Sequence, residues 1–210
     1  MIAVLDYGIG NLRSAEKALQ HLGAPAVLTA EAADASRAAG VVLPGVGAFG
    51  RCMEALREAK LEKAVHEAVE AGKPFLGICV GMQMLFDESE EAPGVAGLGI
   101  LAGTVRRLRT GLRTPHMGWN ELEVRPGSRL LAGLAERPYV YFVHSYAPEP
   151  AERTAVAAIT DYGGPVVAAV ERGPLWATQF HPEKSGANGL AVLANFVRAC
   201  GFEARSPRRP

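Results

Sequence analysis

The feature of this sequence that most restricts its fold is an alternation of strand-like and helix-like segments through its first half. Residues 2–5, 41–43 and 74–78 are short apolar runs of strand length. Between them, at 12–22 and 53–69, apolar residues recur at the three- and four-residue spacing of an amphipathic helix. Strands that alternate with helices in this way favour an α/β fold, with a mainly parallel central sheet flanked by helices.

The second half has a different pattern, in which strand-like segments follow one another with short turns between them. We expect strands at residues 100–108, 139–145, 155–159, 166–170 and 175–180, and then a helix at 189–200. This succession predicts an antiparallel extension of the sheet. Because neither a repeat nor an interdomain linker is visible, we expect one domain at residues 1–202, followed by a disordered basic tail at 203–210.

Charge excludes several classes of partner. The chain has 210 residues, of which 22 are Lys or Arg and 22 are Asp or Glu, so its formal net charge at pH 7 is zero. A balanced charge offers no broad electrostatic footprint for nucleic acid or for an anionic membrane. We therefore expect no nucleic acid and no membrane as partners, and a small or neutral ligand instead.

The cysteines and the N-terminus indicate a cytoplasmic protein. Cys52, Cys79 and Cys200 are odd in number and far apart, with no CxxC pair that would suggest a zinc site or a redox dithiol. The N-terminal run MIAVLDYGIGN is interrupted by Asp6 and lacks a basic lead, which argues against a signal peptide. No later apolar run approaches the length that crosses a bilayer. A reduced, cytoplasmic setting fits these observations best.

Three glycines after the strand at 41–43 suggest a ligand-binding turn. Gly45, Gly47 and Gly50 form a GxGxxG pattern between a predicted strand and a predicted helix, which is the context of a dinucleotide-binding turn. That fingerprint also requires an acidic residue at the end of the next strand, whereas the next strand here, PFLGIC, ends in cysteine. The missing carboxylate disfavours an NAD enzyme. We expect the glycines to let backbone N–H groups approach a different ligand closely.

Cys79 is either a small buried residue or a nucleophile. Free cysteine is among the most buried residue types, which favours the first interpretation. Gly77 and Gly81, however, stand two positions to either side of Cys79 where a strand gives way to a helix, the arrangement of a nucleophile elbow. The N-terminus of the following helix, whose inner side would carry Met82, Leu85 and Phe86, would favour the thiolate. The N–H groups of Val80 and of the glycine loop near Gly47 would donate to a developing oxyanion.

A thiolate nucleophile needs a general base, and His181 is the best candidate among the five histidines. In QFHPEKS, Pro182 favours an extended conformation for His181, so His181 and Glu183 can lie on one face. Glu183 would orient the imidazole and His181 would shuttle the proton, with Cys79 as nucleophile. By itself, HPE is equally well explained as a surface turn. Its combination with GxCxG predicts the triad.

The remaining candidates are assigned structural roles. His116 and His144 lie among bulky apolar residues, where hydrogen-bonded structural histidines are expected. Cys52 and Cys200 lack the flanking glycines of an elbow, and we expect both to pack passively. The sequence contains no HExxH motif, and we expect neither a catalytic metal nor a cofactor.

Several motifs, taken in order, resemble one family. GICVGMQ and HPE are similar to the signature of class I glutamine amidotransferases. DYGIGN, PGVGAFG, DESEEAPGV, PHMGWN, YFVHSY and QFHPEKS are similar, more narrowly, to the glutaminase subunits of imidazole glycerol phosphate synthases. Sister amidotransferases commonly carry a PGGP- or GGES-type loop where this chain has PGVG. The resemblance covers nearly the whole chain and implies the class I glutamine amidotransferase fold.

The resemblance implies a chemistry and a set of roles. Cys79 would attack the side-chain amide carbon of glutamine, His181 would protonate the departing ammonia, and water would then release glutamate from a γ-glutamyl thioester. Gly47 and Val80 would supply the oxyanion donors. The substrate-binding residues that similarity implies are Gln83, Glu91, Ser145 and Tyr146. Glu91 would pair with the α-ammonium group of the substrate, although without the resemblance it belongs to a solvated acidic run.

The resemblance also implies a partner, a (βα)8-barrel cyclase that receives the ammonia through a protected channel. Ammonia released into neutral water is protonated and loses its nucleophilicity. Together the two subunits would make imidazole glycerol phosphate and an aminoimidazole carboxamide ribotide. The positions that match the interface are Asn11, Val46, Trp119 and Lys184. We therefore expect an apolar and aromatic docking face beside the active site, and a PGVG loop that reorients when the partner binds.

Two alternatives remain open. The chain would be the glutaminase subunit of another class I system, such as pyridoxal phosphate synthase, if it failed to bind the cyclase. It would be a catalytically silent scaffold if it kept the fold only for binding, although the intact Cys79, His181 and Glu183 argue against this.

Overall fold

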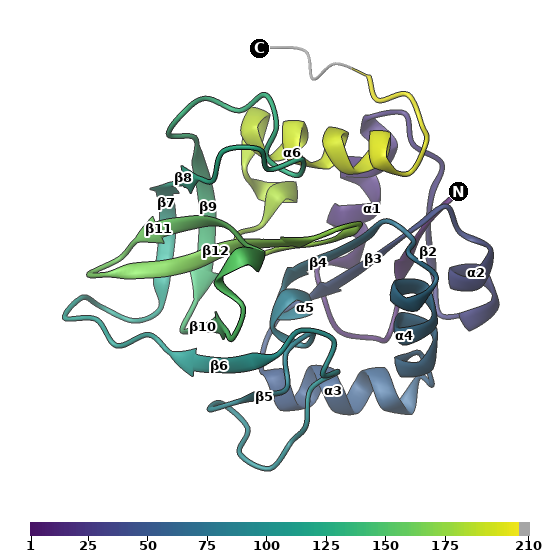
Figure 1. The fold of residues 1–210 in the computed structure, drawn as a ribbon. Helices are drawn as coiled ribbons and strands as arrows, with labels where there is room; N and C mark the ends of the chain where they lie inside the picture. The colour runs from purple at the N-terminus through teal and green to yellow at the C-terminus, as the bar shows by residue number, and fades with distance from the viewer. Residues whose placement is uncertain (206–210) are drawn as a thin grey trace.

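A computed structural model describes residues 1–205, and its centre is an eight-stranded sheet with the order β2-β1-β3-β4-β13-β12-β11-β8 (Figure 1). The parallel part consists of β1 (Ile2–Leu5), β2 (Ala26–Thr29), β3 (Gly40–Gly45), β4 (Phe75–Cys79) and β13 (Leu175–Thr178). The antiparallel part consists of β12 (Pro165–Arg172), β11 (Val156–Asp161) and β8 (Glu123–Val124). The predicted α/β fold with an antiparallel extension is confirmed.

The parallel strands are apolar because helices cover both of their faces. Every residue of β1, β3, β4 and β13 is buried. The covering helices are α1 (Leu12–His21), α2 (Ala32–Arg37), α3 (Phe49–Glu58), α4 (Glu62–Glu70) and α6 (Gly186–Ala199). In Figure 1, α1 and α6 lie on one side of the sheet, whereas α3 and α4 lie on the other. The buried side chains of both halves form one hydrophobic cluster.

Two smaller sheets lie beside the central one. The three-stranded sheet has the order β10-β6-β5 and contains β5 (Glu88–Ser89), β6 (Gly103–Arg107) and β10 (Tyr146–Pro150). The two-stranded sheet pairs β7 (His116–Glu121) with β9 (Tyr139–His144) in antiparallel register. The short helices η1 (Arg153–Ala155) and α5 (Val80–Gln83) connect strands, whereas η2 (Pro182–Lys184) lies between β13 and α6. Only Ser145 separates β9 from β10, so the chain passes from one small sheet to the other at that residue.

The single helix predicted over 53–69 is wrong, because the segment forms two helices. Lys60 has a φ of 56° and ends α3 in the left-handed conformation. The Leu61 N–H donates to the Leu56 carbonyl at 3.1 Å, and the Lys60 N–H donates to the Arg57 carbonyl at 2.9 Å. These two bonds are those of a Schellman-type ending, which normally places glycine where Lys60 stands. The apolar periodicity of the sequence continues from α3 into α4, so this pattern did not reveal the break at Lys60.

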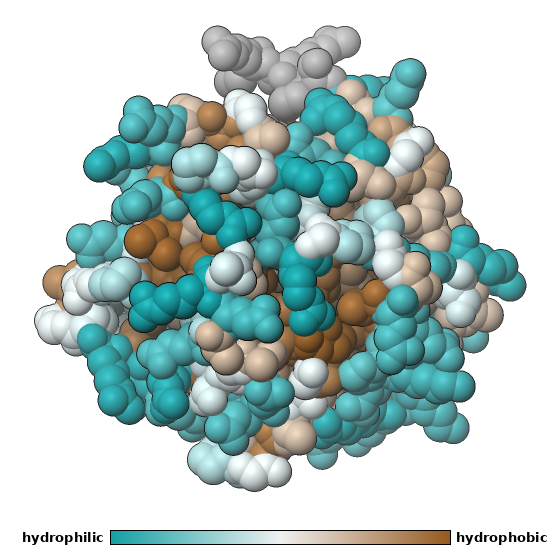
Figure 2. Space-filling model, viewed as in Figure 1, coloured by the Kyte–Doolittle hydropathy of each residue, from teal (hydrophilic) through white to brown (hydrophobic). Residues whose placement is uncertain are grey.

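No helix within residues 1–205 combines the length and the apolar character that spanning a bilayer requires. Of the tail predicted at 203–210, residues 206–210 lie outside the described part, whereas the Arg205 N–H donates to the Leu22 carbonyl at 2.8 Å. Figure 2 shows a largely hydrophilic face with smaller hydrophobic patches.

Candidate active site

Cys79 occupies a strained turn at the carboxyl edge of the parallel sheet. It is the last residue of β4. Its backbone angles, a φ of 55° and a ψ of −112°, lie outside the regions that residues other than glycine normally adopt. The end of β3 lies beside it, with Gly45 as its register partner. Ligands of α/β proteins bind at this edge of the sheet, outside the carboxyl ends of the strands.

The glycines on either side of Cys79 are required by close backbone packing. A Cβ atom on Gly81 would lie 1.9 Å from the Leu43 carbonyl oxygen, and one on Gly77 would lie 3.0 Å from the Gly81 carbonyl oxygen. The turn therefore presses directly against β3 and folds back on its own strand. This is the physical reason for the GxCxG spacing, and it supports the predicted nucleophile elbow.

The helix that follows Cys79 is shorter than predicted. We expected Met82, Leu85 and Phe86 to form the inner side of a longer helix, but α5 contains only four residues, Val80–Gln83. All three side chains are buried, and the Leu85 and Phe86 N–H groups make tight i to i−3 bonds instead. A single turn has a small macrodipole. The charged partner of the thiol is therefore a side chain rather than the helix.

That partner is His181, which is held from two sides. Its Nδ1 lies 2.8 Å from Oε1 of Glu183, and both side chains are 2% exposed. Its backbone N–H donates to the Tyr141 carbonyl at 3.0 Å, which ties it to β9. Glu183 Oε1 also accepts a long bond of 3.5 Å from the Asn11 amide. Within residues 1–205, Nε2 of His181 has no hydrogen-bond partner, which leaves this atom available to the Cys79 thiol.

The electrostatics of His181 favour the imidazolium. Burial by itself would lower the pKa of His181, but the interactions with Cys79 and Glu183 outweigh it and raise that pKa to about 10. The ring therefore holds its proton at neutral pH beside the sulfur. Such a pair can supply a thiolate and a general acid at the same time.

A cavity of about 580 Å³ opens over Cys79 and His181. The other predicted site residues that line it are Asn11, Val46, Gly47, Val80, Gln83, Glu91, Ser145, Tyr146 and Lys184. Two predicted residues do not line it. Glu183 lies behind His181, and Trp119 lies on the outer face of β7. Residues from the central sheet and from both small sheets thus meet around a single cysteine.

Gln179 is a site residue that the sequence analysis missed. Its Nε2 lies 3.7 Å from the Cys79 sulfur, and its Oε1 accepts a 3.0 Å bond from Gln83. The Gln83 amide also donates to the Tyr146 carbonyl at 3.0 Å, so both of its N–H groups are used and its oxygen remains as an acceptor. The spacing of Gln179 and His181, two residues apart, was the available signal, because extended residues at that spacing share a face.

Two predicted residues make contacts that the sequence did not indicate. Glu91 accepts a 2.7 Å bond from the Phe49 N–H at the start of α3, and its carboxylate also borders the cavity. Asn11 stands at the N-cap position of α1, but its side chain makes no capping bond to the backbone. Instead its Oδ1 accepts from the Ser14 hydroxyl at 2.7 Å.

His116 and His144 form a buried hydrogen-bonded pair, which confirms the structural role predicted for them. Their Nδ1 and Nε2 atoms are 3.0 Å apart, and His144 Nδ1 lies 2.8 Å from the Tyr146 carbonyl oxygen. Since a carbonyl only accepts, His144 Nδ1 carries a proton and its Nε2 accepts from His116. Burial lowers the pKa of both rings to about 4, so both are neutral at pH 7.

An apolar strip lies beside the cavity on the two-stranded sheet. Met117, Trp119 and Tyr139 are 62%, 55% and 51% exposed, respectively. Trp119 packs edge-on against Tyr141 across the strand pair, and Met117 pairs with Val143, which borders the cavity. Large exposed apolar side chains in a group mark an interaction surface. We refer to these five residues as the β7–β9 face.

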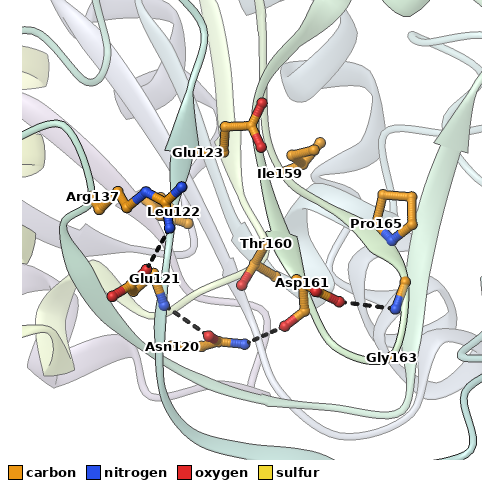
Figure 3. Close-up of a pocket in the computed structure, with 11 residues that line it drawn as sticks. Asn120, Glu121, Leu122, Glu123, Arg137, Ile159, Thr160, Asp161, Gly163 and Pro165 are labelled. Carbon is orange, nitrogen blue, oxygen red and sulfur yellow. Dashed lines mark hydrogen bonds and ion pairs between the residues drawn. The ribbon is translucent and has the colours of Figure 1, made fainter.

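A second cavity, of about 540 Å³, lies between β7, β11 and the turn that follows β11 (Figure 3). The Asn120 amide donates to the Asp161 carbonyl at 2.8 Å, and the Arg137 guanidinium lies 3.5 Å from the Glu121 carboxylate. No cysteine or histidine lines this cavity. Among residues 1–205, no group of three His, Cys, Asp or Glu side chains has the geometry of a metal site. The cavity over Cys79 contains both cysteine and histidine and is the candidate active site.

The comparisons agree with this fold. A family model described as glutamine amidotransferase class-I matches residues 3–200. A crystal structure of a glutamine amidotransferase superposes with a TM-score of 0.76 and 25% identity, covering 96% of this chain and 99% of that one. The glutaminase domain of a Trypanosoma brucei CTPS, 18% identical with a TM-score of 0.68, shares the fold over 99% of this chain and 96% of its own. The chain belongs to the class I glutamine amidotransferase family.

Curated relatives make the assignment within this family more specific. The HisH subunit of imidazole glycerol phosphate synthase from Synechococcus elongatus is 52% identical over 200 residues, covering 93% of this chain and 92% of the relative. The HisH subunits of Deinococcus radiodurans and Methanothermobacter thermautotrophicus are also 52% identical, over 94% of this chain and over 93% and 98% of their own lengths. Within the class I family, this chain is a HisH-type glutamine amidotransferase.

Proposed function

We propose that this chain is the glutaminase subunit of an imidazole glycerol phosphate synthase, with Cys79, His181 and Glu183 as its catalytic triad. The observation that carries the proposal is the strained Cys79 in one cavity with His181, whose Nδ1 lies 2.8 Å from Oε1 of Glu183. The substrate is glutamine, and the products are glutamate and ammonia. The HisH relatives, at 52% identity over nearly the whole chain, support the assignment to this synthase.

The reaction begins with glutamine in the cavity over Cys79. Glu91 pairs with the α-ammonium group, and Gln83, Ser145 and Tyr146 hold the rest of the backbone end of the substrate. The Cys79 thiolate attacks the side-chain amide carbon and forms a tetrahedral oxyanion. The N–H groups of Gly47 and Val80 stabilise the negative oxygen. All seven of these residues line the cavity over Cys79.

The second half of the reaction depends on His181. The imidazolium gives its proton to the departing nitrogen, so that ammonia leaves and a γ-glutamyl thioester remains on Cys79. Neutral His181 then removes a proton from water, and the resulting hydroxide attacks the thioester. Collapse of this second intermediate releases glutamate and regenerates the thiolate and the imidazolium. Glu183 keeps Nδ1 protonated throughout, so that Nε2 remains the atom that moves the proton.

The partner is a (βα)8-barrel cyclase, with which this chain forms a heterodimer. The cyclase docks on the β7–β9 face and on the cavity rim at Asn11, Val46 and Lys184. Docking there closes the cavity, and the ammonia reaches the cyclase site before water can protonate it. The cyclase then uses ammonia to make imidazole glycerol phosphate and an aminoimidazole carboxamide ribotide. Three free cysteines and the match to a biosynthetic family support a cytoplasmic location.

The experiment that tests this function measures glutamate release from glutamine by the chain alone, with the cyclase, and with the cyclase plus its nucleotide ligand. We expect slow release alone and a marked increase with partner and nucleotide. Binding of the cyclase without any glutamate release would favour a silent scaffold. Release of glutamate without cyclase binding in a pull-down would favour another class I amidotransferase system.

A further inference from the structure

The Cys79 sulfur has a second polar neighbour besides His181, which is the side-chain amide of Gln179. Gln179 Nε2 donates to the sulfur over 3.7 Å, a long contact because sulfur is a large acceptor. Gln179 is fully buried, and it is not one of the residues that line the cavity over Cys79. The amide therefore contacts the sulfur from the protein side, where it does not compete with a substrate that enters through the cavity.

The central sheet holds the backbone of Gln179 beside that of Cys79. Thr178, the last residue of β13, pairs with Ile78 of β4. The next residues of these two parallel strands are Gln179 and Cys79. The Gln179 N–H donates to the Ala168 carbonyl at 2.8 Å, which ties this part of the chain to β12. Hydrogen bonds to two neighbouring strands thus fix the position from which the amide reaches the sulfur.

A backbone carbonyl determines which end of the Gln179 amide faces the sulfur. The Tyr146 carbonyl only accepts, so the end of Gln83 that lies 3.0 Å from it is the NH2 group. The same Gln83 nitrogen lies 3.0 Å from the Gln179 amide, so the atom that faces it there is the oxygen. The nitrogen of Gln179 is then the atom that lies beside Cys79. Starting from the carbonyl, each contact admits one orientation.

The Tyr146 carbonyl is itself held by the buried histidine pair. His144 Nδ1 donates to it at 2.8 Å, and His116 Nδ1 donates to His144 Nε2 at 3.0 Å. A carbonyl oxygen has two lone pairs, so it can accept from His144 and Gln83 together. His116, His144 and Gln83 are all buried. A row of buried hydrogen bonds therefore runs from the two-stranded sheet to the Cys79 sulfur.

We propose that Gln179 is a catalytic residue that donates its amide N–H to the Cys79 thiolate, and that Gln83 is the positioning residue that orients this amide. The inference deepens the proposed function and rests on it. Gln179 and His181 are two residues apart in an extended segment, so both can direct a donor at one sulfur. A hydrogen bond to an ionised acceptor is stronger than one to its neutral form. Without Gln179, less of Cys79 is thiolate at a given pH.

The first test measures how the alkylation of Cys79 by iodoacetamide depends on pH in the free full-length chain, as followed by mass spectrometry. Only the thiolate reacts, so the pH of half-maximal rate reports how readily the thiolate forms. Gln179→Met keeps a side chain of similar length without a donor, and we expect this midpoint to rise by about 0.5–1 pH unit. Gln179→Glu keeps an oxygen that accepts from Gln83 but places a carboxylate oxygen beside the sulfur. Its midpoint should rise at least as far.

The matched control is Thr178→Val, which removes a different buried hydrogen bond from the same segment. The Thr178 hydroxyl donates to the Phe180 carbonyl at 2.9 Å, and Thr178 is as buried as Gln179. Side chains of consecutive residues in a strand point to opposite faces, so Thr178 faces away from the sulfur. Thr178→Val should keep the alkylation midpoint of the parent.

The second test measures glutamate release from glutamine in the complex with the cyclase and its nucleotide ligand. In Gln179→Met, kcat/KM should fall by about three- to tenfold at the acid end of the pH profile. The loss should shrink as the pH rises, since the thiolate then forms without the donor. A merely structural role for Gln179 would lower kcat/KM by the same factor at every pH.

Three outcomes would each overturn the inference. They are an unchanged alkylation midpoint in both Gln179 variants, a shift in Thr178→Val as large as in Gln179→Met, and a loss of kcat/KM that does not vary with pH. Alkylation requires neither glutamine nor the cyclase. A parent complex without glutaminase activity would therefore overturn the proposed function, while the alkylation profiles would still decide whether Gln179 stabilises the thiolate.

Discussion

At the scale of the residue, the chemistry depends on a conformation that only a crowded environment maintains. Cys79 has a positive φ without being glycine, and such backbone strain persists only where the surroundings fix it. Gly77 and Gly81 allow neighbouring backbone to pack closely around Cys79. The imidazolium of His181 supplies the positive charge beside the sulfur. The sulfur comes from the end of β4, and the imidazole and the Glu183 carboxylate come from the segment that follows β13. These groups meet because β4 and β13 are neighbouring strands.

Replacing the nucleophile tests this arrangement most directly. Cys79→Ala removes the attacking sulfur, so we expect glutamate release to fall by roughly 10³-fold or more. The cyclase reaction should continue when an ammonium salt replaces glutamine, because the partner then receives ammonia from solution. Both reactions can be followed in the same complex. Glutaminase activity retained by Cys79→Ala would refute the assignment of the nucleophile.

The raised pKa of His181 predicts a dependence of stability on pH. A histidine with a pKa of about 10 in the folded state and about 6.5 in the unfolded state stabilises the fold fully below pH 6.5. That contribution declines as the pH rises from 6.5 towards 10, since the imidazolium is then lost.

Urea unfolding of the parent and of His181→Gln at a series of pH values measures this effect. The difference in free energy of unfolding should be largest near pH 6 and should shrink steadily towards pH 10. A difference that grows with pH would contradict the charged state assigned to His181.

At the scale of the element, the packing of α5 against β3 determines where the nucleophile stands. Because α5 is a single turn, its position is fixed by contact with β3 rather than by its own hydrogen bonds. The same closeness brings the Pro44–Gly47 loop, at the end of β3, next to the sulfur. A short helix and a strand end thus bring together Cys79 and the loop to which we assign the proposed oxyanion donor Gly47.

Gly81→Ala should disrupt this contact. The added methyl group would lie 1.9 Å from the Leu43 carbonyl oxygen, so backbone must move, and we expect a loss of about 2–4 kcal/mol in the free energy of unfolding. The matched control is Gly111→Ala, where nothing lies within 4 Å and φ is not positive. Chemical denaturation of both variants tests the difference. Equal stabilities would show that the turn does not depend on close packing.

At the scale of the whole molecule, three sheets converge on one cavity and leave one apolar face uncovered. The central sheet supplies Cys79, β9 and β10 supply the opposite wall, and the β7–β9 face continues from the cavity to the surface through Val143. The position of this face explains how a partner could seal the site while it binds.

Trp119→Ala tests the docking role of that face. Trp119 is 55% exposed, so its loss should leave the melting temperature nearly unchanged. A central aromatic residue of an interface commonly accounts for about tenfold or more in affinity, and we expect a loss of that size for the cyclase in isothermal titration calorimetry. Val27→Ala, an exposed apolar residue on the edge strand β2, should bind as the parent does. Equal affinities for the two variants would place the interface elsewhere.

Much of the fold was predictable because its signals are local. The apolar runs of β1, β3 and β4 and the glycines around Cys79 depend on neighbours in the sequence, and the sequence placed each of them correctly. The break at Lys60 was not predictable, because a lysine took the position that glycine normally has. Strand β7 was also missed, because His116 is the only buried residue among its six, which leaves no apolar run for a strand prediction.

The sequence alone determined the α/β fold and the residue types that the chemistry needs, because apolar periodicity and short motifs follow from local conformation. The tertiary structure decided which of those residues meet. Gln179 reaches the sulfur from 100 positions away only because β13 pairs with β4. Distances between elements depend on packing, which no local pattern records, and so the geometry around Cys79 belongs to the fold.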